Sequence, residues 1–180
     1  HVGGKGSGLY WLKANGFPVP PTWVLSTAIF DLILERAGVL DAVGEIDRAT
    51  ASSPDWSATQ RALDKLESQR QAVIKALSYE VLPGELHAVL LRLPPHAQWA
   101  VRSSATVEDT EAHSFAGQFY SKLSVPARAS ALEQAVREVW MSVFKREVLA
   151  YRAQFAAPLP RMAVILQPMK PITAGERSGV

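Results

Sequence analysis

The sequence predicts an α/β or α+β fold, in which helices are laid on a sheet. Short apolar runs suited to strands interleave with segments whose apolar residues recur at three- and four-residue steps, as on one face of a helix. Proline and glycine separate these segments. The 180 residues are 48% hydrophobic and 20% charged, which provides enough apolar surface for one domain or two small lobes.

The N-terminal region is predicted to begin with a helix and a strand. Residues 8–15 are predicted to form a short helix, which ends at Gly16 because glycine adopts the left-handed backbone of a helix end readily. The prolines within residues 17–21 exclude helix, so residues 22–25 are predicted to form a brief strand.

The following region is predicted to be mainly helical. Ser26 or Thr27 would cap a helix that ends near Gly38. Small polar residues over 49–59 indicate a loop between helices. A longer helix is predicted from about Thr59, with its apolar face formed by Leu63, Leu66, Val73, Ile74, Leu77 and Val81.

The second half of the chain is predicted to contain the larger strands. Pro83 and Gly84 end the long helix, and a short helix follows. Residues 118–125 alternate, which predicts a strand with Ser121, Leu123 and Val125 on one face. The remaining predicted elements are strands over residues 99–102 and 162–166 and a long amphipathic helix over residues 132–155.

Composition excludes several classes of protein. No apolar run approaches the roughly 18 residues that a membrane-spanning helix needs, and the first residues contain no apolar signal core. The chain has no cysteine, which excludes disulfides and thiolate chemistry. The net charge of +2 comes from dispersed lysine and arginine, so neither nucleic acid nor a membrane is predicted as a partner. A cytoplasmic location is expected.

The first candidate site is the glycine-rich run at residues 3–8. Glycines allow the backbone to approach a ligand closely, helix N-terminal amides attract phosphate oxygens, and Lys5 adds a positive charge. The run matches neither the P-loop nor the dinucleotide-binding fingerprint, since Leu9 stands where the latter needs glycine. A flexible chain start is the alternative interpretation.

The second candidate site covers residues 101–109 and 114–118. Arg102 lies at the end of a predicted buried strand, where an unpaired guanidinium would be costly, so we expect a carboxylate or phosphate partner. The amides around Gly117 and the hydroxyls that follow Arg102 could donate hydrogen bonds to phosphate oxygens. These hydroxyls belong to Ser103, Ser104, Thr106 and Ser114. An ordinary ion pair between Arg102 and Glu108 or Asp109 is the alternative.

The third candidate is Gln167, at the end of an apolar strand. Its amide could hydrogen-bond the edge of an adenine ring within an apolar slot. The alternative is a strand-end side chain that bonds to backbone.

These segments, in this order, resemble one family. The run Gly3-Gly4-Lys5-Gly6, the segment of residues 16–21, the long motif of residues 101–109 and the run Ser114-Phe115-Ala116-Gly117-Gln118 are similar to the N-terminal ATP-grasp domain of phosphoenolpyruvate synthases and pyruvate phosphate dikinases. The resemblance extends essentially from end to end. It implies a partial ATP-grasp domain over residues 1–180, with a mixed, largely antiparallel sheet, a helix-rich region about 26–95, and a sheet-bearing, phosphate-binding region about 1–25 and 96–180.

The resemblance also implies roles for individual residues. Lys5 and Arg102 would bind the ATP phosphates, the loop at Gly117 would cover them, Ser121 would lie along the nucleotide, and Gln167 would face the adenine region. In this family ATP passes a phosphoryl or pyrophosphoryl group, with the help of Mg²⁺, to a histidine on a swinging domain, which carries it to pyruvate or another acceptor.

Parts of the family's machinery are not expected within this chain. Its four histidines, His1, His87, His96 and His113, lack the Thr- and Gly-rich setting of the carrier histidine, and the Mg²⁺ ligands and acceptor domain would lie beyond these residues. The piece alone is therefore expected to be inactive and to bind ATP weakly at best. A rifamycin phosphotransferase, a glucan dikinase, a non-catalytic nucleotide-binding module and a structural remnant remain the alternatives.

Overall fold

The computed structural model describes residues 1–51, 55–79, 82–95, 98–107, 109–110, 113–114, 117–155 and 157–169. Its helices are α1 (Gly3–Ala14), α2 (Thr27–Arg36), α3 (Leu40–Ala51), α4 (Trp56–Lys65), α5 (Glu67–Tyr79), α6 (Gly84–Leu91), α7 (Ala129–Met141) and α8 (Arg146–Gln154), with a 3-10 turn at Ser142–Phe144. Its strands are β1 (Trp23–Leu25), β2 (Gln98–Ala105), β3 (Asp109–Thr110), β4 (His113–Ser114), β5 (Ser121–Pro126) and β6 (Met162–Pro168). The predicted α/β class is confirmed.

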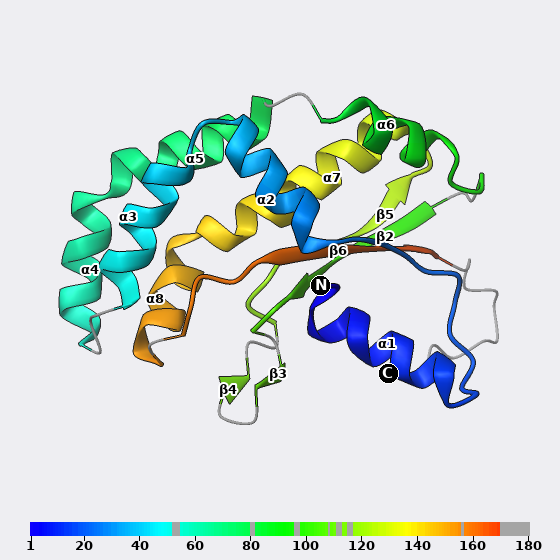
Figure 1. Cartoon of the computed structure of the whole chain (residues 1–180), viewed down its shortest axis with the longest axis horizontal. Coiled ribbons are helices and arrows are strands. Elements are labelled where there is room, and N and C mark those ends of the chain that lie inside the picture. Colours follow the sequence, from blue (N-terminus) through cyan, green and yellow to red (C-terminus); the bar gives the residue numbers. More distant parts are fainter. Residues whose placement is uncertain are drawn as a thin grey trace.

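The main sheet has four strands in the order β1-β6-β2-β5, and every neighbouring pair within it is antiparallel. Strands β3 and β4 form a separate two-stranded ribbon. The two long central strands, β6 and β2, pair along almost their whole length. Strands from the middle and from the last part of the described chain therefore meet at the centre of the sheet, as Figure 1 shows.

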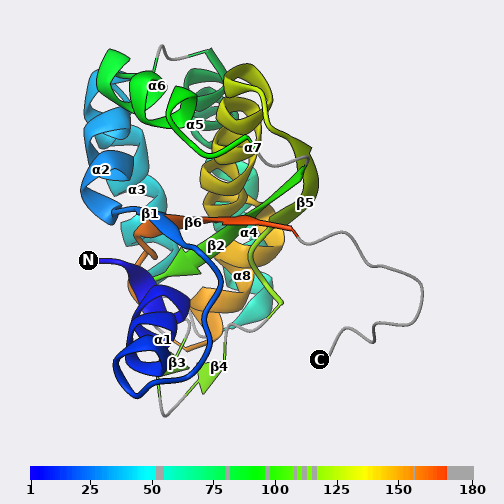
Figure 2. The same ribbon diagram turned by 90° about the vertical axis from the view of Figure 1, so that its right-hand side faces the viewer.

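Helices cover both faces of this sheet. Helices α2 and α7 contact one face, and α1 contacts β2 and β6 from the opposite side (Figures 1 and 2). Helices α3, α4, α5 and α8 pack against one another and extend the helical layer away from the sheet (Figure 1). None of the helices within the described ranges is long and apolar enough to cross a membrane.

The hydrophobic core lies between the sheet and the layer that contains α2 and α7. Phe30 of α2 lies at its centre, with ring centroids 6.2 Å from Trp140 and 6.4 Å from Phe144. Burial of each large apolar side chain contributes about 1.5–3 kcal/mol to folding. Trp140 and Phe144, on the apolar face of the helix predicted over residues 132–155, therefore belong to the core. Other buried members are Ile33, Leu34, Trp99, Val101, Leu132, Val136, Val139, Val164 and Leu166.

The predicted long helix from Thr59 is wrong in its extent, because the chain forms two helices that separate at Leu66. Helix α4 packs against α3 and α8, whereas α5 packs against α3 and α7, and one straight helix could not meet both sets of neighbours. Its start also lies earlier, since Asp55 caps α4 by accepting the backbone N–H of Ser57 at 3.1 Å. Helix α3 occupies a region for which no element was predicted. Because α3 ends at Ala51 and α4 begins at Trp56, the loop predicted over residues 49–59 is shorter than expected.

The predicted helix over residues 132–155 is also interrupted. Ser142 Oγ donates to the carbonyl of Val139 at 2.6 Å and accepts the backbone N–H of Tyr120 at 3.4 Å. A serine that bonds the preceding turn competes with the helical backbone pattern, and the chain here passes through a 3-10 turn before α8 begins. The apolar period continues across the break, so periodicity alone did not reveal it.

Strand β5 departs from the predicted strict alternation. The register with β2 shifts between Trp99 and Val101, and Ser124 has a φ of +57°, which together mark a β-bulge. As a consequence Leu123 is 60% exposed while Val125 is 2% exposed, so these two side chains do not share a face.

A buried arginine joins α8 to α3. Arg152 is 0% exposed; its Nη2 donates to Thr50 Oγ1 at 2.7 Å and to the carbonyl of Asp47 at 2.8 Å. Its Nη1 lies 2.7 Å from a carboxylate oxygen of Asp47. Burial lowers the pKa of Arg152, and the hydrogen bond and charge of Asp47 act in the opposite direction. These contacts hold α8 against α3.

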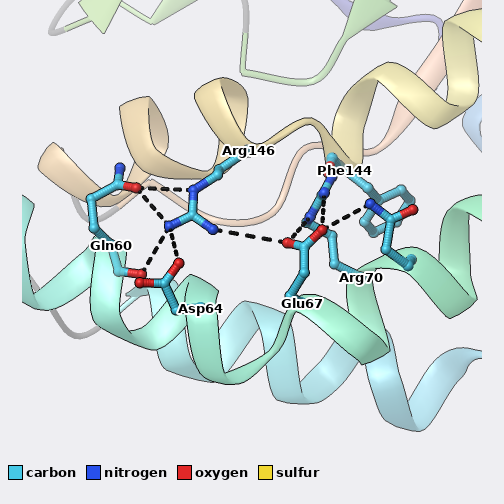
Figure 3. A network of polar contacts seen from close by, with 7 residues as sticks. Gln60, Asp64, Glu67, Arg70, Phe144 and Arg146 are labelled. Atoms are coloured by element: carbon cyan, nitrogen blue, oxygen red, sulfur yellow. Dashed lines mark hydrogen bonds and ion pairs between the residues drawn. The ribbon is translucent and has the colours of Figure 1, made fainter.

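A second network links α4 and α5 to α8 and is shown in Figure 3. Arg146 Nη2 contacts Asp64 at 2.6 Å, and Arg70 donates through Nε to Glu67 at 2.8 Å and through Nη1 to the carbonyl of Phe144 at 3.0 Å. The side chain of Arg70 is only 12% exposed. Arg70 therefore anchors α5 to the turn that precedes α8.

Stability is expected to depend on Glu67 at acidic pH. Hydrogen bonds from Arg70 and then Gln71 lower the pKa of Glu67 to about 2 from its ordinary 4.5. Because its folded pKa is depressed, its stabilising contribution is complete above pH 4.5 and is lost as the pH falls toward 2. Urea titrations across this interval should show a shallower fall in the free energy of unfolding for Glu67→Gln than for the parent.

The matched background for this experiment is Arg70→Gln, which removes the hydrogen bond that lowers the pKa of Glu67. In that background Glu67→Gln should alter the pH dependence much less. Identical pH dependence of the parent and Glu67→Gln would contradict the assignment.

Candidate functional site

The face of the sheet opposite the core is polar at its centre. Successive side chains of a strand point to opposite faces, and the register places Arg102 opposite Ser121 of β5 and next to Ile165 of β6. Gln167 pairs with Ala100, one step along the same face. We define the polar sheet face by its members Arg102, Ser104, Ser121 and Gln167. The fold thus brings together three of the five residues predicted for the site.

Helix α1 packs on this face through its glycines. Ser104 Oγ accepts the backbone N–H of Gly6 at 3.0 Å and donates to the carbonyl of Val2 at 2.7 Å. Gly3 has a φ of +72°, and a Cβ at this residue would lie 2.0 Å from the carbonyl oxygen of Ser104. Only glycine allows this approach, because any side chain would overlap the β2 backbone.

These contacts change the interpretation of the glycine-rich run. The predicted helix start at Gly8 is wrong, since α1 begins at Gly3 and includes the run itself. Glycine is a poor helix former, so the contacts with Ser104 must contribute to the stability of this first turn. Gly3 and Gly6 allow α1 to lie close to β2. From the sequence, these glycines were expected to lie close to a ligand.

Lys5, the fourth predicted site residue, projects from this first turn. Its Nζ lies 3.4 Å from Ser103 Oγ on β2, and the side chain is partly buried. Ser103 is the residue after Arg102 in β2. The structure therefore brings Lys5 to the neighbour of Arg102, although Lys5 and Arg102 are 97 residues apart in the chain.

Arg102 is held by a chain of hydrogen bonds. Its Nη1 donates to Gln167 Oε1 at 3.1 Å, and Gln167 Nε2 donates to Thr22 Oγ1 at 2.9 Å. Thr22 Oγ1 in turn donates to the carbonyl of Pro20 at 2.7 Å. Gln167 is only 6% exposed. We call Thr22, Gln167 and Arg102 the amide relay.

The partner of Arg102 is therefore a neutral amide. Within the described residues, no carboxylate forms an ion pair with this guanidinium, and the side chains of Glu108 and Asp109, which were the predicted alternative partners, lie outside them. An amide, unlike a carboxylate, carries no negative charge that would offset the charge of the guanidinium. The guanidinium can therefore still attract an anionic acceptor. Such a group is suited to a phosphate oxygen.

Ser121 and Gly117 occupy the neighbouring segment. Ser121 is exposed on β5 opposite Arg102, with its backbone directly beside that of β2. Gly117 is exposed in the turn before β5 and has a φ of +76°, which glycine adopts without strain. The predicted hydroxyl donor Ser114 belongs to β4, but its side chain lies outside the described residues.

The remaining polar candidates lie elsewhere. His87 forms a contact with Glu133 that joins α6 to α7, while His96 and the side chain of His113 fall outside the described residues. No group of three His, Asp or Glu side chains suitable for a metal ion is found in the part of the chain that the structure describes. The polar sheet face itself contains no carboxylate, so its residues do not fit Mg²⁺, which prefers carboxylate and phosphate oxygens.

Sequence reasoning missed the residues that hold the site in place. Thr22 was assigned only to a strand, and Ser103 and Ser104 only to possible phosphate donors. Thr22 also borders a cavity of about 190 Å³ between α1 and the segment that leads into β1, lined further by Leu9, Tyr10, Lys13, Val19, Pro20 and Val24. The spacing of 145 residues between Thr22 and Gln167 provides no local signal for their hydrogen bond.

Arginine and hydroxyl side chains on one sheet face, with a lysine that contacts the same strand, are features of a site suited to phosphate-bearing ligands. The chain belongs to the family described as pyruvate phosphate dikinase, AMP/ATP-binding domain, which matches residues 1–180. The family resemblance inferred from the motifs is thereby confirmed.

Several curated proteins are similar to this chain. A rifampicin phosphotransferase from Streptomyces sviceus is 31% identical over 172 residues, which cover 93% of this chain and 19% of that protein. A phosphoenolpyruvate synthase from Aeropyrum pernix is 31% identical over 180 residues, covering 93% of this chain and 21% of that protein. A probable phosphoenolpyruvate synthase from Methanothermobacter thermautotrophicus is 27% identical over 193 residues, covering 99% and 26%. The chain thus spans about a fifth to a quarter of these relatives.

Proposed function

We propose that this chain is the ATP-binding part of a phosphotransferase that moves a phosphoryl or pyrophosphoryl group from ATP, through a carrier histidine, to pyruvate. The observation that carries the proposal is the placement of Arg102, with its charge met only by an amide among the described residues, beside Ser121 and one residue from the partner of Lys5. The membership of an AMP/ATP-binding family supports ATP as the ligand.

In this proposal Lys5 and Arg102 bind the ATP phosphates, and the loop at Gly117 covers them. Two cationic groups placed in advance would stabilise the charge that spreads over the transferring phosphoryl group, which is the main help a protein can give this reaction. Ser121 lies along the nucleotide. Gln167 faces the adenine region, where Thr22 forms a wall of the neighbouring cavity.

The other components of the reaction are assigned to regions of a longer protein. The chain would be a partial ATP-grasp domain, with a helix-rich region about 26–95 and a phosphate-binding region about 1–25 and 96–180. Mg²⁺ would be held by carboxylates outside the described residues. The swinging phosphohistidine domain and the acceptor domain would complete the enzyme. ATP and pyruvate are metabolites of the cytoplasm, which is where we expect the reaction.

A second acceptor class is supported by one specific observation. The rifampicin phosphotransferase of Streptomyces sviceus and the phosphoenolpyruvate synthase of Aeropyrum pernix are equally identical to this chain, at 31%. Similarity in this domain therefore does not choose between a rifamycin and pyruvate as the acceptor. Assay of the full-length protein with each acceptor, with phosphorus NMR of the products, would decide between them.

The phosphate contacts are tested by titrating the full-length protein with Mg²⁺-ATP in a calorimeter. Lys5→Ala and Arg102→Ala should each weaken binding about 10- to 100-fold, since a hydrogen bond to a charged group contributes about 1.5–3 kcal/mol. Lys122→Met is the matched control. It removes a lysine from the same strand as Ser121, but one that binds Glu138 of α7 at 2.7 Å on the other face.

ATP affinity in Lys122→Met should stay within about twofold of the parent. Unchanged affinity in both Lys5→Ala and Arg102→Ala, with folding preserved, would reject the phosphate-site assignment.

A further inference from the structure

The amide relay contains a directional constraint. A threonine hydroxyl has a single proton, and that of Thr22 is donated to the carbonyl of Pro20 at 2.7 Å. Toward Gln167 the same oxygen can therefore only accept, so the side-chain amide must present its NH₂ group to Thr22. This orientation turns the amide oxygen toward Arg102.

Arg102 in turn can accept no hydrogen bond, because a guanidinium carries only donors. The oxygen of Gln167 is thus the one end of the amide that Arg102 can use, and the 3.1 Å contact has the required polarity. The opposite amide rotamer would place two donors against each other at Arg102. Gln167 is 6% exposed, so water has little access to repair such a mismatch.

We propose that Thr22 is a positioning residue for Arg102, acting through the amide orientation of Gln167. This inference rests on the proposed role of Arg102 in binding ATP phosphates. Thr22 lies in the segment before β1, outside every candidate motif. Through Gln167 of β6 it links that segment to Arg102 of β2. Its hydroxyl determines where the guanidinium is held on the polar sheet face before the nucleotide arrives.

The first test compares Thr22→Val with Thr22→Ser in the full-length protein. Valine keeps the shape of threonine but lacks the hydroxyl, whereas serine keeps the hydroxyl and loses a methyl group. We expect Thr22→Val to weaken Mg²⁺-ATP binding about 3- to 10-fold, the size expected for one neutral hydrogen bond, and Thr22→Ser to stay within about twofold of the parent. Thermal unfolding of each variant verifies that it is folded.

The second test combines these changes with Arg102→Ala. If Thr22 acts through Arg102, Thr22→Val should cause no further loss of affinity in the Arg102→Ala background, because coupled residues are not additive. An equal loss in both backgrounds, or no loss in the parent, would overturn the inference while leaving the phosphate-site proposal intact.

A third measurement needs no nucleotide. In the ATP-free protein, nitrogen-15 NMR of the Gln167 side-chain amide should show shifted signals and faster exchange with water in Thr22→Val, shifted signals in Arg102→Ala, and neither change in Thr22→Ser. An amide that does not respond to Thr22→Val rejects the relay. If the amide responds but Arg102→Ala leaves ATP affinity unchanged, the relay positions Arg102 as inferred and the phosphate role proposed for Arg102 is what fails.

Discussion

Replacement of Arg152 by alanine is expected to lower the free energy of unfolding by about 2–5 kcal/mol, the cost of truncating a large, fully buried side chain. The guanidinium is 0% exposed and binds both Thr50 and Asp47 of α3. Its removal leaves a cavity, a hydroxyl without its donor and a carboxylate without its counter-charge. A loss of this size is a large part of the roughly 5–15 kcal/mol that stabilises a typical domain.

Arg146 provides the matched control, because it lies on the same helix and also contacts an aspartate. Its side chain is 30% exposed, and that of its partner Asp64 is 67% exposed. Arg146→Ala should therefore cost about 1 kcal/mol or less. Urea titrations of both variants, with ATP affinity measured where the protein folds, check the contrast. Equal small losses would mean that the contacts of Arg152 do not hold α8 in place.

Replacement of Gly3 by alanine is expected to have the second large effect. The new Cβ would lie 2.0 Å from the carbonyl oxygen of Ser104, and alanine at a φ of +72° is strained in addition. Backbone strain and overpacking together should cost about 2–5 kcal/mol. The first turn of α1 should move off β2, carrying Lys5 away from Ser103, so ATP affinity in the full-length protein should fall with stability.

Gly8→Ala is the control within the same helix. Nothing lies within 4 Å of a Cβ at Gly8, and alanine is the better helix former. This variant should gain about 0.5–1 kcal/mol and retain ATP affinity. Hydrogen exchange of the α1 amides should accelerate in Gly3→Ala and slow in Gly8→Ala. Similar behaviour of the two variants would show that the close contact with Ser104 does not determine the position of α1.

Periodicity predicted which segments are helical or extended more reliably than where they end. The helix-forming spacing continues through Leu66 and through Ser142, yet the chain breaks at both because successive helices must meet different neighbours. The bulge at Ser124 is a comparable case, since it depends on the register with β2 and not on the residues of β5 alone.

For the site, the chemical character of the residues was readable and their arrangement was not. An arginine at the end of an apolar strand required a partner, and the sequence offered a phosphate or the acidic residues a few positions away. The partner within the described residues is Gln167, which reaches Arg102 only because β2 and β6 are antiparallel neighbours. The glycines near Lys5 were correctly identified as sites of close approach, although what they approach is Ser104.

Local sequence patterns were sufficient to predict the α/β class, the apolar faces of the main elements and, through the motifs, the family. These properties follow from local patterns: the period of apolar residues, the backbone restrictions of glycine and proline, and motifs of contiguous residues. The tertiary structure alone decided the strand order, the break points of the helices, the docking of α1 and the amide relay. Each of these depends on contacts between residues far apart in the chain, whose free energy exists only after packing has brought them together.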